Sequence, residues 1–423
     1  MGEFWPGAAG RSEYSTQPMK YIQLPRLLVA TAACAVVGAT AVPAQRLGPP
    51  PKRPKAESVA DTNSAKQYLD YATAVFEKDP QASAAAFYWA ARIDPTSAAA
   101  LYGRSMALTL TNRTLIANVW AGTSRRRDSK EQRAVDSLRL QALMIDPFLY
   151  SGLGIRLMKG ALSQEAPGGD ELQMQYAFDS MLQGADPYTR GIVSYSQGNF
   201  KRALQYFAEA MKSAKDKAGY RIERARIFAI TSAPDSAIAE FNLALDELRK
   251  RDKKDLVVLY NSKALLEHSI GTLHERSQQL AAAKEAYGKA LQEDLSYYPA
   301  HLRLGLLAVD AGDTITALSE LDLAASIAVD EPQVHLIYGY ALSRFEKYAD
   351  AIRALNKAIT LEPYYSRPYE ILAGTLEKTG DRAGAAAAYG NFLAYSNQND
   401  PGRALATQKR AALGKFLELE FKP

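Results

Sequence analysis

The stretch GYALSRFEKYADAIRALNKAITLEP, residues 339–363, decides the fold of this chain. Small residues stand at Gly339, Ala351 and Ala358, large apolar residues lie between them, and Pro363 closes the stretch. This pattern predicts two short helices joined by a tight turn at FEKY, because proline lacks the amide hydrogen that would continue the second helix. Such a pair cannot bury its own apolar face, so it has to pack against similar neighbours.

Neighbours with the same pattern follow at a fixed spacing of 34 residues. The central alanine recurs at Ala283, Ala317, Ala351 and Ala385, and the early small residue recurs at Gly271, Gly305, Gly339 and Ala373. The same step joins Ala203 to Ala237, whereas Ala237 and Ala283 are 46 residues apart, so about 12 residues are inserted around DELRKRDKKDLV. A period of this length indicates an array of helical hairpins.

These positions resemble the tetratricopeptide repeat, whose 34-residue pattern combines spaced aromatic, small and apolar residues with a closing proline. The resemblance is clear over residues 184–395 and weak over 63–183, where two units end at Pro95 and Pro147 and an insertion of about 18 residues separates them. It implies an all-α, right-handed α-solenoid of roughly seven to nine stacked helix-turn-helix hairpins. In the opening unit the matching positions are His335, Tyr338, Gly339, Leu342, Ala351, Leu355, Ala358 and Pro363.

The chain is expected to divide into five segments. The last of them contains RALATQKRAALGKFLELEF, which predicts an amphipathic capping helix with Leu405, Leu413, Phe416 and Leu417 on one side. The Pro-rich linker is expected to make no packing contacts. The segments are 1–44, an N-terminal extension and signal peptide; 45–62, the linker; 63–183, degenerate helical hairpins; 184–397, the repeat array; and 398–423, the capping helix.

The N-terminal sequence predicts export. An uncharged apolar run, RLLVATAACAVVGATAVPAQ at residues 26–45, follows Lys20 and ends in small residues, so a signal peptidase is expected to cleave after Ala44. The mature protein would then be periplasmic or secreted. The alternative is an uncleaved helix that anchors a structural subunit of a complex in the inner membrane. Either Met1 or Met19 fits as the first residue.

The resemblance also implies where a partner would bind. In this family the first helix of each hairpin lines a concave face, and tyrosine and arginine are the side chains that most often anchor interfaces. The residues that fall on this face are Tyr188, Tyr195, Arg226, His268, Arg276, Tyr340, Arg344 and Arg367.

The remaining residue patterns argue against other classes of function. The single cysteine, Cys34, excludes a disulfide or a cysteine-based metal site within the chain, and no pattern for a nucleophile, a phosphate loop or a cofactor is present. His301 and His335 stand where the family has tryptophan, which favours packing over metal binding. The net charge of +5 is too weak to predict nucleic-acid binding. The short basic runs at 124–128 and 249–254 fit a solvated loop or helix end, or else a contact with anionic lipid or an acidic partner. We therefore expect a non-catalytic protein without cofactor or metal, which binds a protein or peptide.

Overall fold

The computed structural model describes residues 50–54, 59–112, 130–150, 153, 156, 183–252 and 262–420. All regular structure in these ranges is α-helical, as predicted. The chain divides into two compact units, the first formed mainly by 150–258 and 266–286, the second by 31–149, 259–265 and 287–423. Among the described helices, none is both long enough and apolar enough to cross a bilayer.

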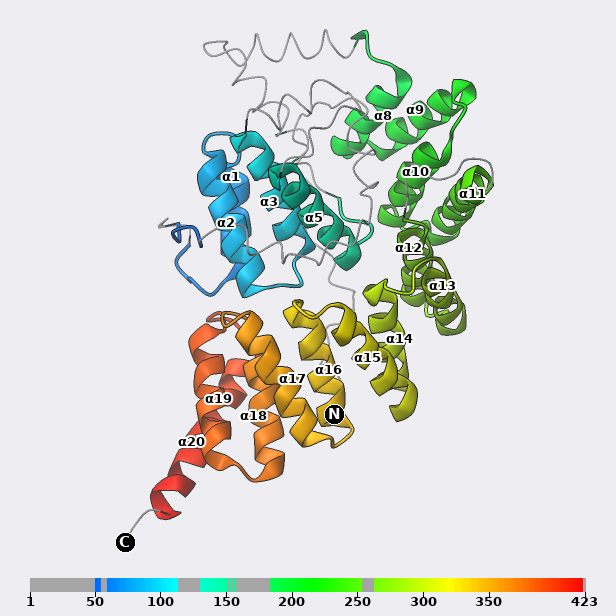
Figure 1. Cartoon of the computed structure of the whole chain (residues 1–423). Helices are drawn as coiled ribbons and strands as arrows, with labels where there is room; N and C mark the ends of the chain where they lie inside the picture. The colour runs from blue at the N-terminus through cyan, green and yellow to red at the C-terminus, as the bar shows by residue number, and fades with distance from the viewer. Residues whose placement is uncertain are drawn as a thin grey trace. The chain divides into compact units, whose positions relative to one another are not determined.

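The two units are built from helices that follow one another as hairpins (Figure 1). The first unit contains α8 (Pro187–Ser196), α9 (Phe200–Ser213), α10 (Ala218–Ile230) and α11 (Pro234–Asp252), and α12 (Lys263–Arg276) and α13 (Leu280–Glu293) contribute residues to both units. The second unit contains α1 (Ala65–Val75), α2 (Pro80–Ile93), α3 (Ala98–Thr111), α5 (Lys130–Ile145), α14 (Tyr298–Ala311), α15 (Thr314–Ile327), α16 (Pro332–Arg344), α17 (Tyr348–Leu361), α18 (Arg367–Thr379), α19 (Arg382–Tyr395) and α20 (Gly402–Glu420). The stretch that opened the sequence analysis forms the C-terminal half of α16, from Gly339 to Arg344, and all of α17, with a turn between them, which confirms the predicted helical hairpin.

The turns of the six hairpins from α8–α9 to α18–α19 have the same backbone geometry. One residue adopts a left-handed conformation, with φ near 60° at Glu346 and 74° at Gly312, and the next amide donates across the turn, as Lys347 N does to Leu342 O at 2.8 Å. These left-handed residues keep the predicted period, including the single step of 46, so they confirm the repeat register. They are Gly198, Ser232, Gln278, Gly312, Glu346 and Gly380.

Small residues allow the two helices of a hairpin to approach closely. A Cβ atom added at Gly339 would lie 2.7 Å from Leu355 Cγ, and one added at Gly305 would lie 2.6 Å from Leu321 Cγ. Both distances are shorter than van der Waals contact, so the first helix could not sit this close to the second with a larger side chain. The period in the sequence therefore reflects helix crossing.

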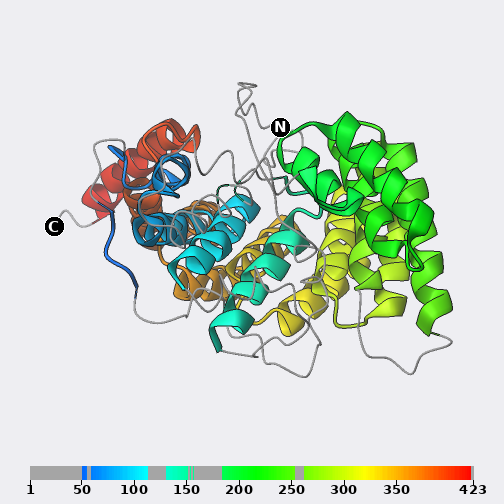
Figure 2. The ribbon, with the colours of Figure 1, turned by 90° about the horizontal axis from the view of Figure 1, so that it is seen from above.

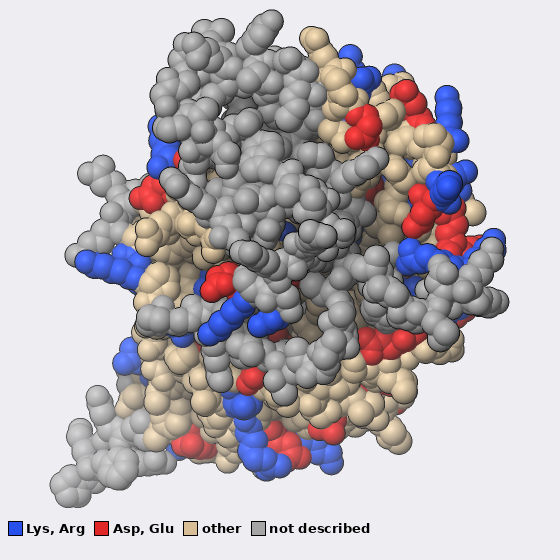
Figure 3. Space-filling view, turned by 45° about the horizontal axis from the view of Figure 1, so that its top comes forward, with Lys and Arg blue, Asp and Glu red and all other residues tan. Residues whose placement is uncertain are grey.

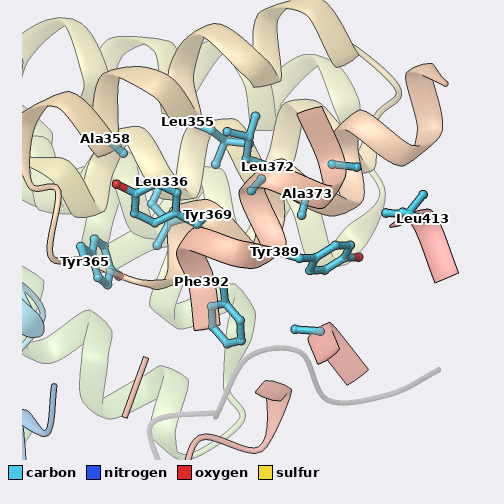
Figure 4. Packing of buried hydrophobic residues seen from close by; sticks show 13 residues of the cluster. Leu336, Leu355, Ala358, Tyr365, Tyr369, Leu372, Ala373, Tyr389, Phe392 and Leu413 are labelled. Carbon is cyan, nitrogen blue, oxygen red and sulfur yellow. The ribbon is translucent and has the colours of Figure 1, made fainter. Parts of the chain in front are cut away.

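The apolar core of the last repeats runs continuously from one hairpin into the next. Figure 4 shows Leu355 of α17, Leu372 of α18 and Phe392 of α19 in a single cluster. The predicted capping helix is present as α20, and its Leu413 completes this cluster. Leu405, predicted on the same buried side, is instead 49% exposed, whereas the next residue, Ala406, is buried in the cluster.

Residues 50–54 differ from the expectation of a linker without packing contacts, since Arg53 lies over two aromatic rings. Several predictions fall outside the described residues: the signal peptide with Cys34, and nearly all of the insertion at 111–128 with its basic run.

Candidate binding surface

The strongest candidate for contact with a partner is a polar surface on α14 and α16. Arg344 is exposed, and its Nη1 lies 3.5 Å from the Tyr340 hydroxyl, to which it donates, and 4.0 Å from an Asp310 carboxylate oxygen. The Tyr340 ring is half-buried against an apolar cluster formed by α14, α15 and α16, so its hydroxyl is held at a fixed place. We call Asp310, Tyr340 and Arg344 the Tyr340–Arg344 surface.

This surface can exchange its internal contacts for contacts with a partner. The Arg344–Asp310 pair is solvated, with side chains 46% and 78% exposed, and pairs of this kind contribute at most about 1 kcal/mol. Replacing Asp310 by a partner's carboxylate therefore costs little. Because α14 and α16 are the first helices of consecutive hairpins, the surface spans two repeats.

Arg367, on α18, is held more tightly within the chain. Its guanidinium lies 2.6 Å from Glu370 and 3.2 Å from Asp400, whose side chain is 6% exposed. Burial alone would lower the pKa of Arg367, but the hydrogen bond to Glu370 and the two carboxylate charges raise it above its usual value. Contact of Arg367 with a partner would therefore compete with two acidic side chains.

Tyr188 and Tyr195, on α8, lie among other aromatic rings. Tyr188 is 7% exposed and packs edge-on against Tyr220, with ring centroids 5.1 Å apart, and burial raises the pKa of its hydroxyl well above the usual value. The burial of Tyr188 differs from the prediction, which placed it on an exposed face. Tyr195 is half-buried and lies 5.4 Å from the ring of Tyr150.

Arg226 belongs to a network of charges in the first unit. It donates to Glu223 at 3.0 Å on its own helix. On the same helix, Arg221 and Arg224 both donate to Glu240 of α11, at 3.1 and 2.9 Å. Arg221 also donates to Glu247 of α11 at 2.9 Å, so the three arginines are balanced by three carboxylates, and the bonds of Arg221 and Arg224 stabilise the packing of α10 on α11.

His268 and Arg276, both on α12, have different surroundings. His268 is 4% exposed and therefore lies in the core, which differs from its predicted place in a groove. Arg276 ends the helix and is exposed. Of the eight predicted residues, Tyr340 and Arg344 are in direct contact. Arg367 lies in the same unit, and the other five belong to the first unit.

The two histidines that are one repeat apart serve packing. His335 Nε2 hydrogen-bonds the carbonyl of Val329 at 2.9 Å, and His301 Nε2 makes the equivalent bond to Leu295 at 3.1 Å. One repeat later, the Tyr369 hydroxyl donates to the carbonyl of Pro363 at 3.2 Å. A polar ring at this position therefore ties each first helix to the loop before it, in agreement with the packing interpretation.

The basic run at 249–254 is partly used in ion pairs. Arg249 lies 2.7 Å from Glu267, and Arg251 lies 3.2 Å from Asp216. On the face drawn in Figure 3, basic and acidic side chains lie close together over the described helices. This mixture favours contact with a protein surface over a uniformly charged ligand.

A cluster of aromatic and arginine side chains was missed by the sequence analysis. Trp89 and Tyr364 lie edge to face, 5.4 Å apart, and the guanidinium groups of Arg53 and Arg92 lie over both rings. Arg92 Nε also donates to Glu362 Oε2 at 2.8 Å, where the glutamate side chain is 1% exposed. The sequence carries a weak signal for this cluster, namely a tryptophan and an arginine three residues apart in WAARIDP.

Comparison with known proteins gives a family for one repeat. Residues 332–365 match the sequence model described as the tetratricopeptide repeat. A TPR repeat-containing thioredoxin, TTL4 of Arabidopsis thaliana, is 25% identical over 210 residues. That match covers 49% of this chain and 30% of the plant protein, so this chain spans less than a third of that relative.

Several solved structures also resemble this one. YrrB, described as a TPR protein with an unusual peptide-binding site, is 18% identical, covers 49% of this chain and 100% of its own, and superposes with a TM-score of 0.39. MamA from Desulfovibrio magneticus RS-1 is 18% identical, with 43% and 95% of the two chains covered and a TM-score of 0.36. The APC/C hetero-tetramer Cut9–Hcn1 is 15% identical, with 82% and 76% covered and a TM-score of 0.39.

Proposed function

This chain is a tetratricopeptide-repeat protein, and from that premise we propose that it is a non-catalytic scaffold or assembly factor that binds a protein or peptide at the Tyr340–Arg344 surface. Proteins with this fold generally mediate protein–protein interactions. The observation that carries the proposal is the exposed Arg344, held 3.5 Å from the Tyr340 hydroxyl beside Asp310 on the preceding hairpin. A fixed aromatic ring next to a weakly paired arginine is a common anchor at protein interfaces.

The Tyr340–Arg344 surface suits a peptide that presents a carboxylate to Arg344 and a donor to Asp310. Loss of both anchors removes the aromatic contact and the charge together, so we expect a partner to bind at least about tenfold more weakly. The test is recovery of partners by the mature chain compared with the Tyr340→Ala, Arg344→Ala double variant. Once a partner has been identified with the wild-type chain, its dissociation constant is measured for the wild-type chain and for each variant.

The matched control is Arg353→Ala, which removes an exposed arginine from α17, the second helix of the same hairpin. We expect this variant to retain the partner. Equal recovery of the partner by the double variant and the wild-type chain would refute the binding assignment, and loss of binding in the control alone would place the contact on the second helices.

Export to the periplasm or beyond the cell is part of the proposal and is supported by the apolar run and the small residues before Gln45. N-terminal sequencing of the protein purified from its native host tests this directly. A chain that begins at Gln45 supports export with cleavage. A chain that still carries residues 26–44 supports the alternative of an anchored subunit in a membrane complex.

A further inference from the structure

The N-terminal hairpins of the second unit contact three successive loops between the last repeats. Gln141 donates to Glu331 at 3.1 Å before α16, and Arg92 donates to Glu362 at 2.8 Å before α18. Asn63 donates to the carbonyl of Ala394, in the last turn of α19, at 2.8 Å and to that of Ser396, before α20, at 3.5 Å. Figure 1 shows the lower end of α2 facing the upper ends of α18 and α19, and Figure 2 shows the blue helices overlapping the orange and red ones in the view from above. The aromatic cluster lies at the middle of these three contacts.

A short segment of the chain occupies this cluster. The Trp89 indole Nε1 donates to the carbonyl of Pro51 at 3.0 Å. Two residues later, the Arg53 guanidinium lies 4.3 Å from the centroid of the Trp89 ring and 4.8 Å from that of Tyr364. The Trp89 ring thus contacts both the carbonyl of a proline and the guanidinium of an arginine two residues further along the chain.

The surroundings of the two rings are fixed by the fold. Arg92 lies 4.8 Å from the Tyr364 ring and is bound by Glu362, which also accepts a hydrogen bond from the backbone amide of Tyr364 at 3.2 Å. Glu362 therefore orients both Arg92 and the loop that carries Tyr364. Because hydrogen bonds hold Arg92 and the Tyr364 loop in position, the site that Arg53 occupies is formed by the folded helices.

We propose that Trp89 and Tyr364 form a binding site for a proline- and arginine-containing peptide, and that residues 50–54 occupy this site as an intramolecular ligand. Proline-rich segments are recognised in this way, because they are already extended and an indole donor can reach a free carbonyl. The arginine adds a cation–π contact with each ring. A partner segment of the same chemistry would bind by displacing residues 50–54. The proposal concerns a different site from the Tyr340–Arg344 surface and does not depend on it.

The test uses the full chain and a fluorescein-labelled peptide with the sequence of residues 46–58, RLGPPPKRPKAES. In the wild-type chain the tethered segment competes at a local concentration of about a millimolar, so the added peptide binds weakly. In the Arg53→Ala variant the tethered segment loses its cation. We expect fluorescence anisotropy to show peptide binding at least about tenfold tighter than to the wild-type chain.

Two matched controls distinguish specific recognition of the peptide from nonspecific binding. A peptide in which alanine replaces the arginine, RLGPPPKAPKAES, is expected to bind the Arg53→Ala chain about tenfold more weakly than the native peptide. Adding Trp89→Phe to that chain keeps an aromatic ring but removes the indole donor, and is expected to weaken binding further.

The proposal is overturned if the Arg53→Ala chain, with a melting temperature close to wild type, does not bind the peptide. It is also overturned if both peptides bind equally. If the alanine variant does not fold, Arg53→Gln replaces it, because the glutamine keeps a long polar side chain without the charge. Partner recovery through the Tyr340–Arg344 surface is measured separately, so failure of one proposal does not imply failure of the other.

Discussion

Glu346 adopts a backbone conformation that a side chain disfavours. Its φ is 59°, whereas the equivalent turn positions one repeat before and after are Gly312 and Gly380. A left-handed conformation costs a residue with a Cβ about 1 kcal/mol relative to glycine. We expect Glu346→Gly to raise the free energy of unfolding in urea by about 0.5–1 kcal/mol.

The neighbouring turns supply the control for this prediction. Gly312→Ala and Gly380→Ala are expected to lower the free energy of unfolding by about 1 kcal/mol, because each puts a Cβ on a left-handed residue. A Glu346→Gly protein that is no more stable than wild type would show that the Glu346 side chain makes a compensating contact.

His301 and His335 occupy equivalent positions but have pKa values shifted in opposite directions. The hydrogen bond to Glu320 raises the pKa of His301 above 6.5, whereas burial, assisted by Lys357, lowers the pKa of His335 below it. The His301 contribution to stability is therefore complete below the unfolded pKa and is lost as pH rises through the folded value. The His335 contribution is complete above the unfolded pKa and is lost as pH falls through the folded value.

The imidazole signals in an NMR titration test these shifts. His301 is expected to titrate above pH 6.5 and His335 below it, with His301→Gln and His335→Gln used to assign the signals. Glu320→Gln should bring the titration of His301 down toward its usual range and leave that of His335 unchanged. Titration of both histidines at one pH would contradict the proposed role of Glu320.

At the scale of the helical hairpin, the fold depends on close helix crossing. A methyl group at position 339 would meet Leu355 at 2.7 Å, so Gly339→Ala is expected to lower the free energy of unfolding by about 1–3 kcal/mol. Gly374, also in a first helix, has open space at its Cβ. Gly374→Ala is therefore expected to raise stability by up to about 1 kcal/mol through helix propensity.

Thermal and urea unfolding of these two variants isolate the effect of the contact with Leu355, since both variants replace a helical glycine by alanine. Loss of stability in both would indicate a backbone requirement rather than a crossing distance.

The sequence predicted the hairpins well because each repeat packs against its neighbours through the same positions. The same residue types therefore recur in the sequence at a constant spacing. The small residue at Gly339 and the left-handed turn at Glu346 follow from this rule. Contacts that occur once leave no period. Arg92 and Glu362 are 270 positions apart, and no repeat relates them, so their pairing could not be predicted. Tyr188 was placed on a surface by its register, but Phe207 and Tyr220 surround it.

At the scale of the whole molecule, the Arg92–Glu362 pair connects the N-terminal hairpins with the last repeats of the second unit. Burial raises the pKa of Glu362, and the hydrogen bond from Arg92 opposes that rise. Arg92→Ala would leave a buried carboxylate without this partner, so we expect a loss of about 3 kcal/mol in the free energy of unfolding. Arg353→Ala, at an exposed arginine, is expected to change it by less than about 0.5 kcal/mol.

A double replacement tests whether the charge itself causes the loss. Arg92→Met with Glu362→Met fills similar volume without charge, and this variant is expected to be more stable than Arg92→Ala alone. If the single and double variants are equally destabilised, the loss comes from packing around Tyr364 and not from the unpaired carboxylate.

The three contacts between the N-terminal hairpins and the last repeats also bear on the kinetics of folding. In a repeat protein whose units touch only their neighbours, folding spreads from one unit to the next and the outermost units fray first. Here Asn63 is bonded to the carbonyl of Ala394, so α1 and α19 cannot separate without breaking a contact across more than 300 positions. Forming such a contact requires the closure of a long loop, which slows folding. The early and late helices of the second unit should therefore exchange their amide hydrogens as one cooperative group.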